Sequence, residues 1–238
     1  MRHRFFLLTA MFILLFAAPV SSQNNIRVSC RSFTMNVPSE NVHCYQIEDN
    51  IPVTDGASPE EIARAQIAST SIYISDFLVS GSVIEPQVTF YLLDDLAKTS
   101  FSLLDPAMRL SEMISNLQAG DITADSLNEE IPFLPFQAEP ITIQALPALI
   151  SCINGTGLRT VTAFQEQIKS NGNESNLYYS WQGLSDDGKY YISAVFPLRS
   201  VSLDGKSVSS VEWNELVLSD LLPSLDQLDY YISSIVIE

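Results

Sequence analysis

Apolar and polar positions alternate most regularly in the C-terminal half of the chain. Four runs there have the period of two that is typical of strands, and turn-forming residues separate them. We expect strands over residues 143–153, 158–168, 176–184 and 189–197. Because short turns join them, the pattern predicts an antiparallel meander. The run from 190 to 196 is apolar at both odd and even positions, which indicates a strand that is covered on both faces.

The rest of the chain mixes shorter strands with helices. The strands are expected over residues 26–36, 42–48, 67–79 and 84–93. Helices are expected at 58–61, from Asp94-Asp95, over 103–118 and from Pro223. The third has an apolar stripe of Met108, Leu110, Met113, Ile114 and Leu117, and Gly120 ends it. The pattern predicts an α+β fold, with an antiparallel sheet packed by a few helices.

The N-terminus has the pattern of a secretory leader. Basic residues Arg2 and Arg4 precede the apolar run 5–20, and the small residues Ser21 and Ser22 follow it. We expect cleavage near Ser22, which leaves residues 23–238 as a single globular domain in an extracytoplasmic compartment. An uncleaved membrane anchor is the alternative, but the run is shorter than a span of about 20 apolar residues. No later segment is apolar enough to span a membrane.

Acidic residues dominate the charge of the chain. It has 28 Asp and Glu against 12 Lys and Arg, a net charge of −16. Removal of the leader takes away two arginines and would make the charge −18. Such a surface repels phosphate backbones and anionic lipids, so nucleic acid is not an expected partner. The charge favours solubility outside the cell, or attraction to cations and basic partners.

The three cysteines predict one disulfide. If 26–36 and 42–48 form a hairpin centred near Val37, Cys30 and Cys44 lie opposite each other, and an oxidising compartment would favour their bridge. Cys152 is then a free thiol, which we interpret as a buried small apolar residue.

Motifs for metals, cofactors and catalytic triads are missing from the sequence. The expected mature chain has one histidine, His43, and no nucleophile elbow accompanies any serine. Zinc and nucleotide motifs do not occur either, so we expect no cofactor and no metal. The acidic pairs Asp94-Asp95 and Asp186-Asp187 have the oxygen ligands that calcium prefers, but a type I′ hairpin turn explains Asp187-Gly188 without a metal.

An aromatic group on the predicted strands suggests one ligand surface. Tyr179 and Trp181 share a face, and together with Asp186 and Asp187 they are our candidate ligand-binding residues. The alternative for the aromatic residues is cross-strand packing beneath helices. Asn154 and Asn173 begin glycosylation sequons in predicted turns.

Residues 179–198 carry a distinctive motif. It reads Gln182-Gly-Leu-Ser-Asp-Asp-Gly-Lys-Tyr-Tyr191, followed by an apolar strand that ends at Pro197. In this motif the chain resembles a group of uncharacterised secreted bacterial proteins from Chloroflexi-like lineages. The likeness extends to the turn at 154–159 and to the helix start at Pro223. It implies an exported bacterial protein and no catalytic residue. Some of those relatives look like lipoproteins, whereas this chain has no suitably placed cysteine.

Three functional hypotheses follow. The first is a secreted, non-enzymatic binding domain, extracellular or envelope-associated, for a protein, peptide or carbohydrate. The second is an extracellular hydrolase with an acidic pair that the sequence does not single out. The third is a structural or envelope-assembly subunit, which a large exposed apolar patch would favour.

Overall fold

The computed structural model describes most of the chain beyond its N-terminus. The described residues are 25–38, 40–51, 61, 67–75, 77, 84–99, 101–121, 123, 127, 130–134, 140–170, 175–213 and 218–238. The expected leader, most of the expected helix at 58–61, and Asn173 lie outside them.

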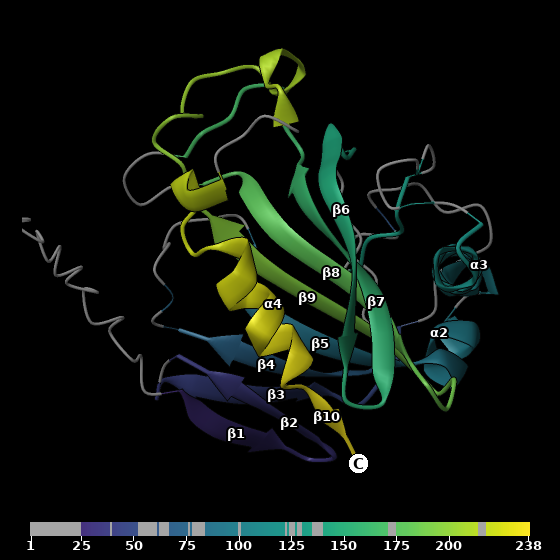
Figure 1. The fold of residues 1–238 in the computed structure, drawn as a ribbon. Coiled ribbons are helices and arrows are strands. Elements are labelled where there is room, and N and C mark those ends of the chain that lie inside the picture. The colour runs from purple at the N-terminus through teal and green to yellow at the C-terminus, as the bar shows by residue number, and fades with distance from the viewer. Residues whose placement is uncertain are drawn as a thin grey trace, which may run out of the picture.

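A seven-stranded antiparallel sheet forms the centre of the molecule (Figure 1). Its strands, in spatial order, are β3 (Val42–Ile47), β4 (Ser69–Ile74), β5 (Gln87–Leu92), β9 (Tyr190–Leu198), β8 (Leu177–Ser185), β7 (Gly155–Ala163) and β6 (Ile143–Cys152). The predicted meander is confirmed as β6 to β9, in which each strand pairs with the next. Pairing of β5 with β9 joins the meander to the three N-terminal strands.

A second sheet of three strands contains β1 (Ile26–Cys30), β2 (Phe33–Val37) and β10 (Val236–Ile237). The expected hairpin of 26–36 with 42–48 is therefore wrong. The chain already reverses at Arg31, whose φ of 54° lies in the left-handed region, so β1 pairs with β2. β3 instead joins the edge of the large sheet. The Cys30–Cys44 disulfide is nevertheless confirmed, and it connects the two sheets with 5.7 Å between the Cα atoms.

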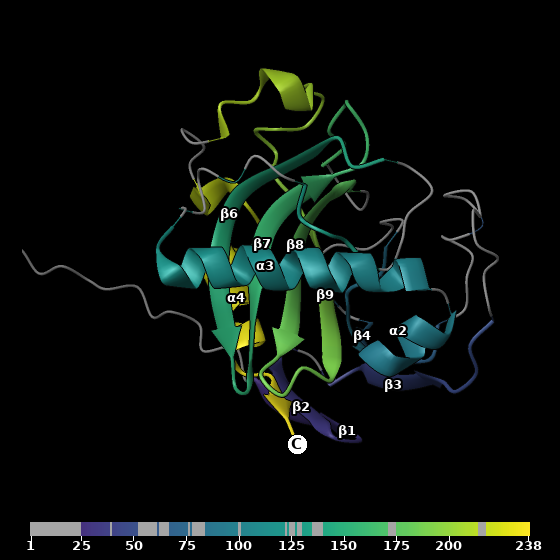
Figure 2. The same ribbon diagram turned by 90° about the vertical axis from the view of Figure 1, so that its right-hand side faces the viewer.

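Helices cover both faces of the large sheet. Two of them, α2 (Leu93–Thr99) and α3 (Asp105–Ala119), lie on one side, and α4 (Leu225–Ser233) lies on the other (Figure 2). α3 has a proline in its first turn, and Gly120, whose φ is 78°, caps its C-terminus. α4 begins two residues later than Pro223, because the Ser224 hydroxyl accepts a hydrogen bond from the Gln227 N–H and caps the helix.

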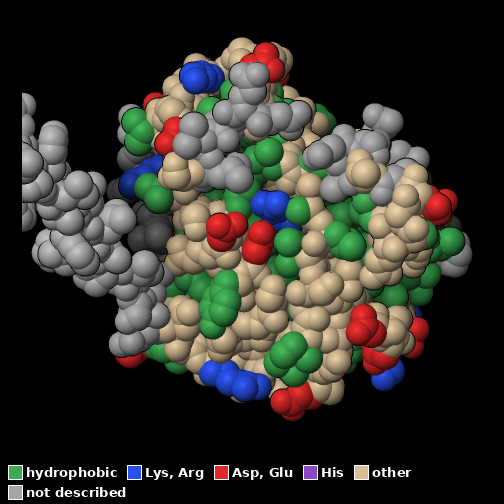
Figure 3. Space-filling model, viewed as in Figure 1, with side chains coloured by type: hydrophobic (Ala, Val, Ile, Leu, Met, Phe, Trp, Pro, Cys, Tyr) green, Lys and Arg blue, Asp and Glu red, His purple; other side chains and the backbone are tan. Residues whose placement is uncertain are grey.

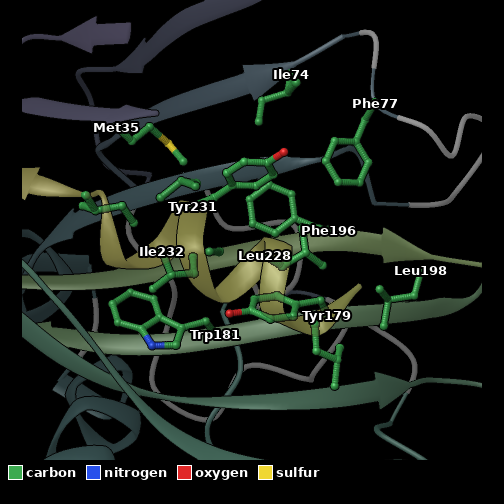
Figure 4. Packing of buried hydrophobic residues seen from close by; sticks show 14 of the residues in the cluster. Met35, Ile74, Phe77, Tyr179, Trp181, Phe196, Leu198, Leu228, Tyr231 and Ile232 are labelled. Carbon is green, nitrogen blue, oxygen red and sulfur yellow. The ribbon is translucent and has the colours of Figure 1, made fainter. Parts of the chain in front are cut away.

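Large aromatic and aliphatic side chains fill the space between α4 and the sheet. Trp181, Tyr179 and Phe196 project from β8 and β9 towards Leu228 and Ile232 of α4 (Figure 4). All five are fully buried. Burial of each such side chain contributes roughly 1.5–3 kcal/mol relative to its exposure, so this cluster stabilises the packing of α4 on the meander.

The opposite face of the sheet carries a buried polar network. The Gln182 amide holds the backbone of Leu134: its oxygen accepts from the Leu134 N–H at 3.1 Å, and its nitrogen donates to the Leu134 carbonyl at 3.4 Å. Gln144 holds Ile131 in the same way, at 2.7 and 2.8 Å. These side chains fix segment 131–134 against the sheet beside α3, so its buried polar groups are satisfied.

Figure 3 shows the surface on the α4 side of the molecule. Apolar side chains are scattered over this face among acidic and basic ones, and they do not merge into one large patch. Within the described residues, no helix is long and apolar enough to cross a membrane.

Candidate functional site

The two aromatic residues expected to bind a ligand lie in the core. Trp181 and Tyr179 have 0% exposure, so neither ring face can reach a ligand in this structure. The Trp181 Nε1–H donates to the Ile150 carbonyl at 3.1 Å, and the Tyr179 hydroxyl donates to Asp229 Oδ1 at 2.8 Å. Their position is that of the alternative, cross-strand packing beneath a helix.

The Tyr179–Asp229 contact belongs to a largely buried charged group. The Arg159 Nε lies 3.9 Å from Asp229 Oδ1, and this nitrogen is buried without a hydrogen-bond partner among the described residues. Burial raises the pKa of Asp229, although the Arg159 charge acts in the opposite direction. The charged form of Asp229 therefore carries a desolvation cost, which the nearby Arg159 charge partly offsets.

Asp186 and Asp187 occupy the turn between β8 and β9. The Gly188 N–H donates to the Ser185 carbonyl at 2.9 Å, and only Gly188 has a positive φ, of 68°. A type I′ turn needs a positive φ at both central residues, and Asp187 has none, so the expected type I′ turn at Asp187-Gly188 is wrong. Asp187 contacts the Lys189 Nζ at 2.8 Å and the Ser185 hydroxyl at 2.7 Å, and these contacts lower its pKa to about 2. Asp187 is therefore a turn-stabilising residue.

Asp186 faces a different environment. Its backbone N–H donates to the Asn154 carbonyl at 3.0 Å, which joins the β8–β9 turn to the β6–β7 turn. Its carboxylate is exposed and lines a groove of about 720 Å³ beside α3. This volume falls in the range of small-ligand sites. The groove brings together the end of β8, the start of β7, the first residue of α2 and one side of α3.

The residues that line the groove divide into an apolar group, called the floor below, and a polar group, called the edges. The floor consists of Leu93, Leu104, Ala107, Met108, Ile114 and Leu184. Leu93, Leu104 and Leu184 are only half-buried, and Met108 is 62% exposed, so apolar surface is accessible within the groove. The edges consist of Ser111, Glu112, Ser115, Gln118, Thr156, Ser185, Asp186 and Gly188. An accessible apolar surface framed by polar groups is the usual form of a ligand site.

Only acidic charges line this groove. Glu112 comes from α3 and Asp186 from the β8–β9 turn, and no lysine, arginine or histidine is among the described residues that line it. Neither carboxylate forms an ion pair within the described part of the chain. The groove is therefore an apolar surface with two uncompensated negative charges.

The other hollows are less suited to an apolar ligand. A hollow of about 290 Å³ between the two sheets contains the Arg31–Glu48 ion pair, at 3.7 Å, so its charges compensate each other. A shallow hollow lined by Asp105, Pro106 and Arg109 adjoins the groove, because Met108 and Glu112 line both. It extends the groove towards the start of α3.

Metal and nucleophile candidates do not come together. In the part of the chain that the structure describes, no three His, Cys, Asp or Glu side chains cluster closely enough to hold a metal ion. Asp95 pairs with Lys98 at 2.7 Å, while Asp94 is exposed. His43 is on β3 and Cys152 on β6, which are opposite edges of the sheet. Burial also raises the pKa of the Cys152 thiol to about 12, so it stays protonated.

Sequence reasoning placed Met108 on the buried stripe of α3, and the structure corrects this. Leu110, Met113 and Ile114 are buried, whereas Met108 is exposed. Two residues of helix turn by about 200°, so Met108 cannot share a side with Leu110. Ser111 and Glu112 follow Met108 by three and four residues, so all three lie on one side of the helix. This spacing is the feature of the sequence from which the groove side of α3 could have been predicted.

Comparisons with protein-family models, with curated proteins and with solved structures find no match to this chain. The resemblance to secreted bacterial proteins therefore remains a prediction from the 182–191 motif. Asn154, the sequon residue within the described chain, is exposed, and its Nδ2 donates to the Ile237 carbonyl at 3.0 Å.

Proposed function

We propose that this protein is a secreted, non-catalytic binding domain that takes its ligand in the groove beside α3. The observation that supports this most is the accessible apolar floor at Met108, Leu93 and Leu184, framed by polar groups from two separate elements. Exposed apolar surface in a concave site favours a binding role, because covering it stabilises a complex. The groove lies between α3 and the β8–β9 turn, and backbone hydrogen bonds from Gly188 to Ser185 and from Asp186 to Asn154 hold this turn.

The proposed location outside the cytoplasm has two supports. The Cys30–Cys44 bridge is of a kind that persists in oxidising compartments and is rare in the cytosol. The N-terminal segment has the order of a cleavable leader, with a basic start, an apolar run and small residues. An acidic surface is compatible with a soluble extracellular domain.

A hydrolase with an acidic pair is the second candidate. Glu112 and Asp186 supply two carboxylates to the same groove, which is the arrangement that such an enzyme needs. Both are exposed, however, whereas the general acid of a glycosidase is enclosed by apolar side chains. This difference makes binding the better-supported function.

Thermal unfolding of residues 23–238 tests the proposal. The panel contains calcium, mono- and oligosaccharides, and short peptides, and each is measured with the wild type and with Ser111→Trp. Ser111 is exposed on the groove edge, so an indole there fills the groove without entering the core. Ala119→Trp is the matched control, because Ala119 is exposed on α3 but does not line the groove.

A ligand at 100 times its Kd adds about 2.7 kcal/mol of stability, which a melting curve resolves. We expect at least one organic probe to stabilise the wild type and Ala119→Trp but not Ser111→Trp. A panel without any shift, or a shift that Ser111→Trp leaves intact, would contradict the groove as the ligand site. Turnover of a bound probe, lost in Glu112→Gln and Asp186→Asn, would replace the binding function by the hydrolase.

A further inference from the structure

We propose that the occupant of the groove is an extended peptide segment in which Lys or Arg side chains alternate with apolar ones. This inference rests on the proposed function and adds the chemical class of the ligand. Three features of the groove support it: its charge, its length, and the distribution of its polar groups.

The charge of the groove selects a cation. Glu112 and Asp186 stand on opposite sides, one on α3 and one on the β8–β9 turn, and no basic side chain lines the groove between them. Among the basic side chains nearby, Lys189 pairs with Asp187 at 2.8 Å and Lys98 with Asp95 at 2.7 Å, while Arg109 lines the adjoining hollow together with Asp105 and Glu112. A ligand with basic side chains would compensate two carboxylates that the protein leaves unpaired.

The length of the groove fits a short extended chain. Its α3 residues run from Ala107 to Gln118, which corresponds to about 16 Å of helix axis. An extended peptide rises about 3.3 Å per residue, so about five residues fill this length. The adjoining hollow, which begins at Met108 and Glu112, leaves room for roughly one residue more.

Polar groups along both edges can serve peptide amides. Ser111, Ser115 and Gln118 follow one another on the α3 edge, and Thr156 and Ser185 lie on the strand edge. The Ser115 hydroxyl donates to the Ser111 carbonyl at 2.8 Å, so it remains available as an acceptor for a ligand N–H. Alternating side chains of an extended peptide point in opposite directions, so apolar groups that face the floor leave the basic groups facing away from it, where their long side chains can still reach the two carboxylates.

Met108 provides an adaptable part of the floor. Its side chain is 62% exposed, and an unbranched thioether can fit apolar groups of different shape. The floor therefore suits several aliphatic side chains, whereas the carboxylates distinguish basic neighbours from acidic ones. Specificity in this site comes from charge, with the apolar contacts supplying affinity.

The test is calorimetric titration of residues 23–238 with three capped hexapeptides. They alternate Leu with Lys, Leu with Ser, and Leu with Glu. We expect the Leu-Lys peptide to bind at least tenfold more tightly than the other two. Glu112→Gln and Asp186→Asn should each weaken it two- to fivefold, as expected for exposed charge pairs. Ser111→Trp should abolish binding of this peptide.

The matched control is Glu40→Gln, which removes the same charge from an exposed site outside the groove. It should leave the affinity unchanged. An equal loss in Glu40→Gln and Glu112→Gln would show nonspecific attraction to an acidic protein and overturn the inference. If all three peptides bind alike and Ser111→Trp abolishes this, the ligand class is wrong and the binding groove stands. If none of them binds, the ligand class is also wrong, and the ligand panel decides the proposed function separately.

Discussion

Gly183→Ala is predicted to destabilise the protein through a clash with Trp181. Gly157 and Gly183 pair across β7 and β8, and the indole of Trp181 folds over them. A Cβ at position 183 would lie 2.3, 2.6 and 2.8 Å from the Cη2, Cζ2 and Cζ3 atoms of that indole. Because Trp181 is fully buried and hydrogen-bonded to Ile150, the ring has no free space into which it can move.

Overpacking of this kind costs about 1–3 kcal/mol of unfolding free energy. The three atoms in the clash belong to the six-membered ring of tryptophan, and phenylalanine lacks them. In the Trp181→Phe background, Gly183→Ala should therefore be neutral, or stabilising by about 0.5–1 kcal/mol, because alanine is the better strand residue. The coupling energy between the two positions should be about 2 kcal/mol.

Urea unfolding of the four proteins measures this coupling. Far-UV circular dichroism is the suitable signal, since removal of Trp181 changes the fluorescence. Trp181→Phe alone should cost about 1–3 kcal/mol through the lost hydrogen bond to Ile150 and the smaller ring. If Gly183→Ala costs the same in both backgrounds to within about 0.5 kcal/mol, Trp181 does not lie over Gly183 and the described core is wrong.

Three further predictions concern stability. Replacing Cys30 and Cys44 by serine should lower the unfolding free energy by about 3 kcal/mol, because the bridge closes a short loop across 14 residues; a loss below about 1 kcal/mol in urea unfolding would contradict this. Burial raises the pKa of Asp229, so the native state binds more protons than the unfolded state, and the wild type loses stability as the pH rises above about 4. Asp229→Asn lacks this loss, so its unfolding free energy minus that of the wild type should increase from pH 3 to 7. A difference that stays constant with pH would refute the raised pKa. The pKa of Asp187 is lowered to about 2, so its contribution to the unfolding free energy is present above about pH 4 and lost towards pH 2. Because the pair with Lys189 is exposed, Asp187→Asn should lower the unfolding free energy by less than about 1 kcal/mol at pH 7. An equal loss at pH 2 would contradict the lowered pKa.

The strands of the meander could be predicted because their signals are local. Period-two alternation and turn residues such as Gly188 lie within the segments themselves. The break between β1 and β2 could not, because Arg31 adopts a left-handed conformation that its residue type rarely takes. β10 has only two residues and forms because Val236 and Ile237 pair with β2 from the other end of the chain. Its existence depends on tertiary contacts that no local pattern contains.

The candidate site was less accessible to sequence reasoning for the same reason. Alternation shows that Tyr179 and Trp181 share a face, but α4, which covers that face, follows more than 40 residues later. The groove joins α3 to a turn about 70 residues away, so Asp186 could be selected for its residue type but not for its place beside Glu112. Helix geometry did contain one usable signal, since the exposed Met108 lies opposite the buried stripe.

The groove as the ligand site can be tested most directly by amide chemical-shift mapping of ¹⁵N-labelled residues 23–238 during titration with the Leu-Lys hexapeptide. We predict shifts for amides between Ala107 and Gln118 and between Leu184 and Gly188. The indole N–H of Trp181, buried and bonded to the Ile150 carbonyl, should stay unchanged. Shifts centred on the Trp181 indole or on the α4 face, with α3 unaffected, would contradict the groove as the ligand site. They would favour the aromatic face of the sheet as the binding surface.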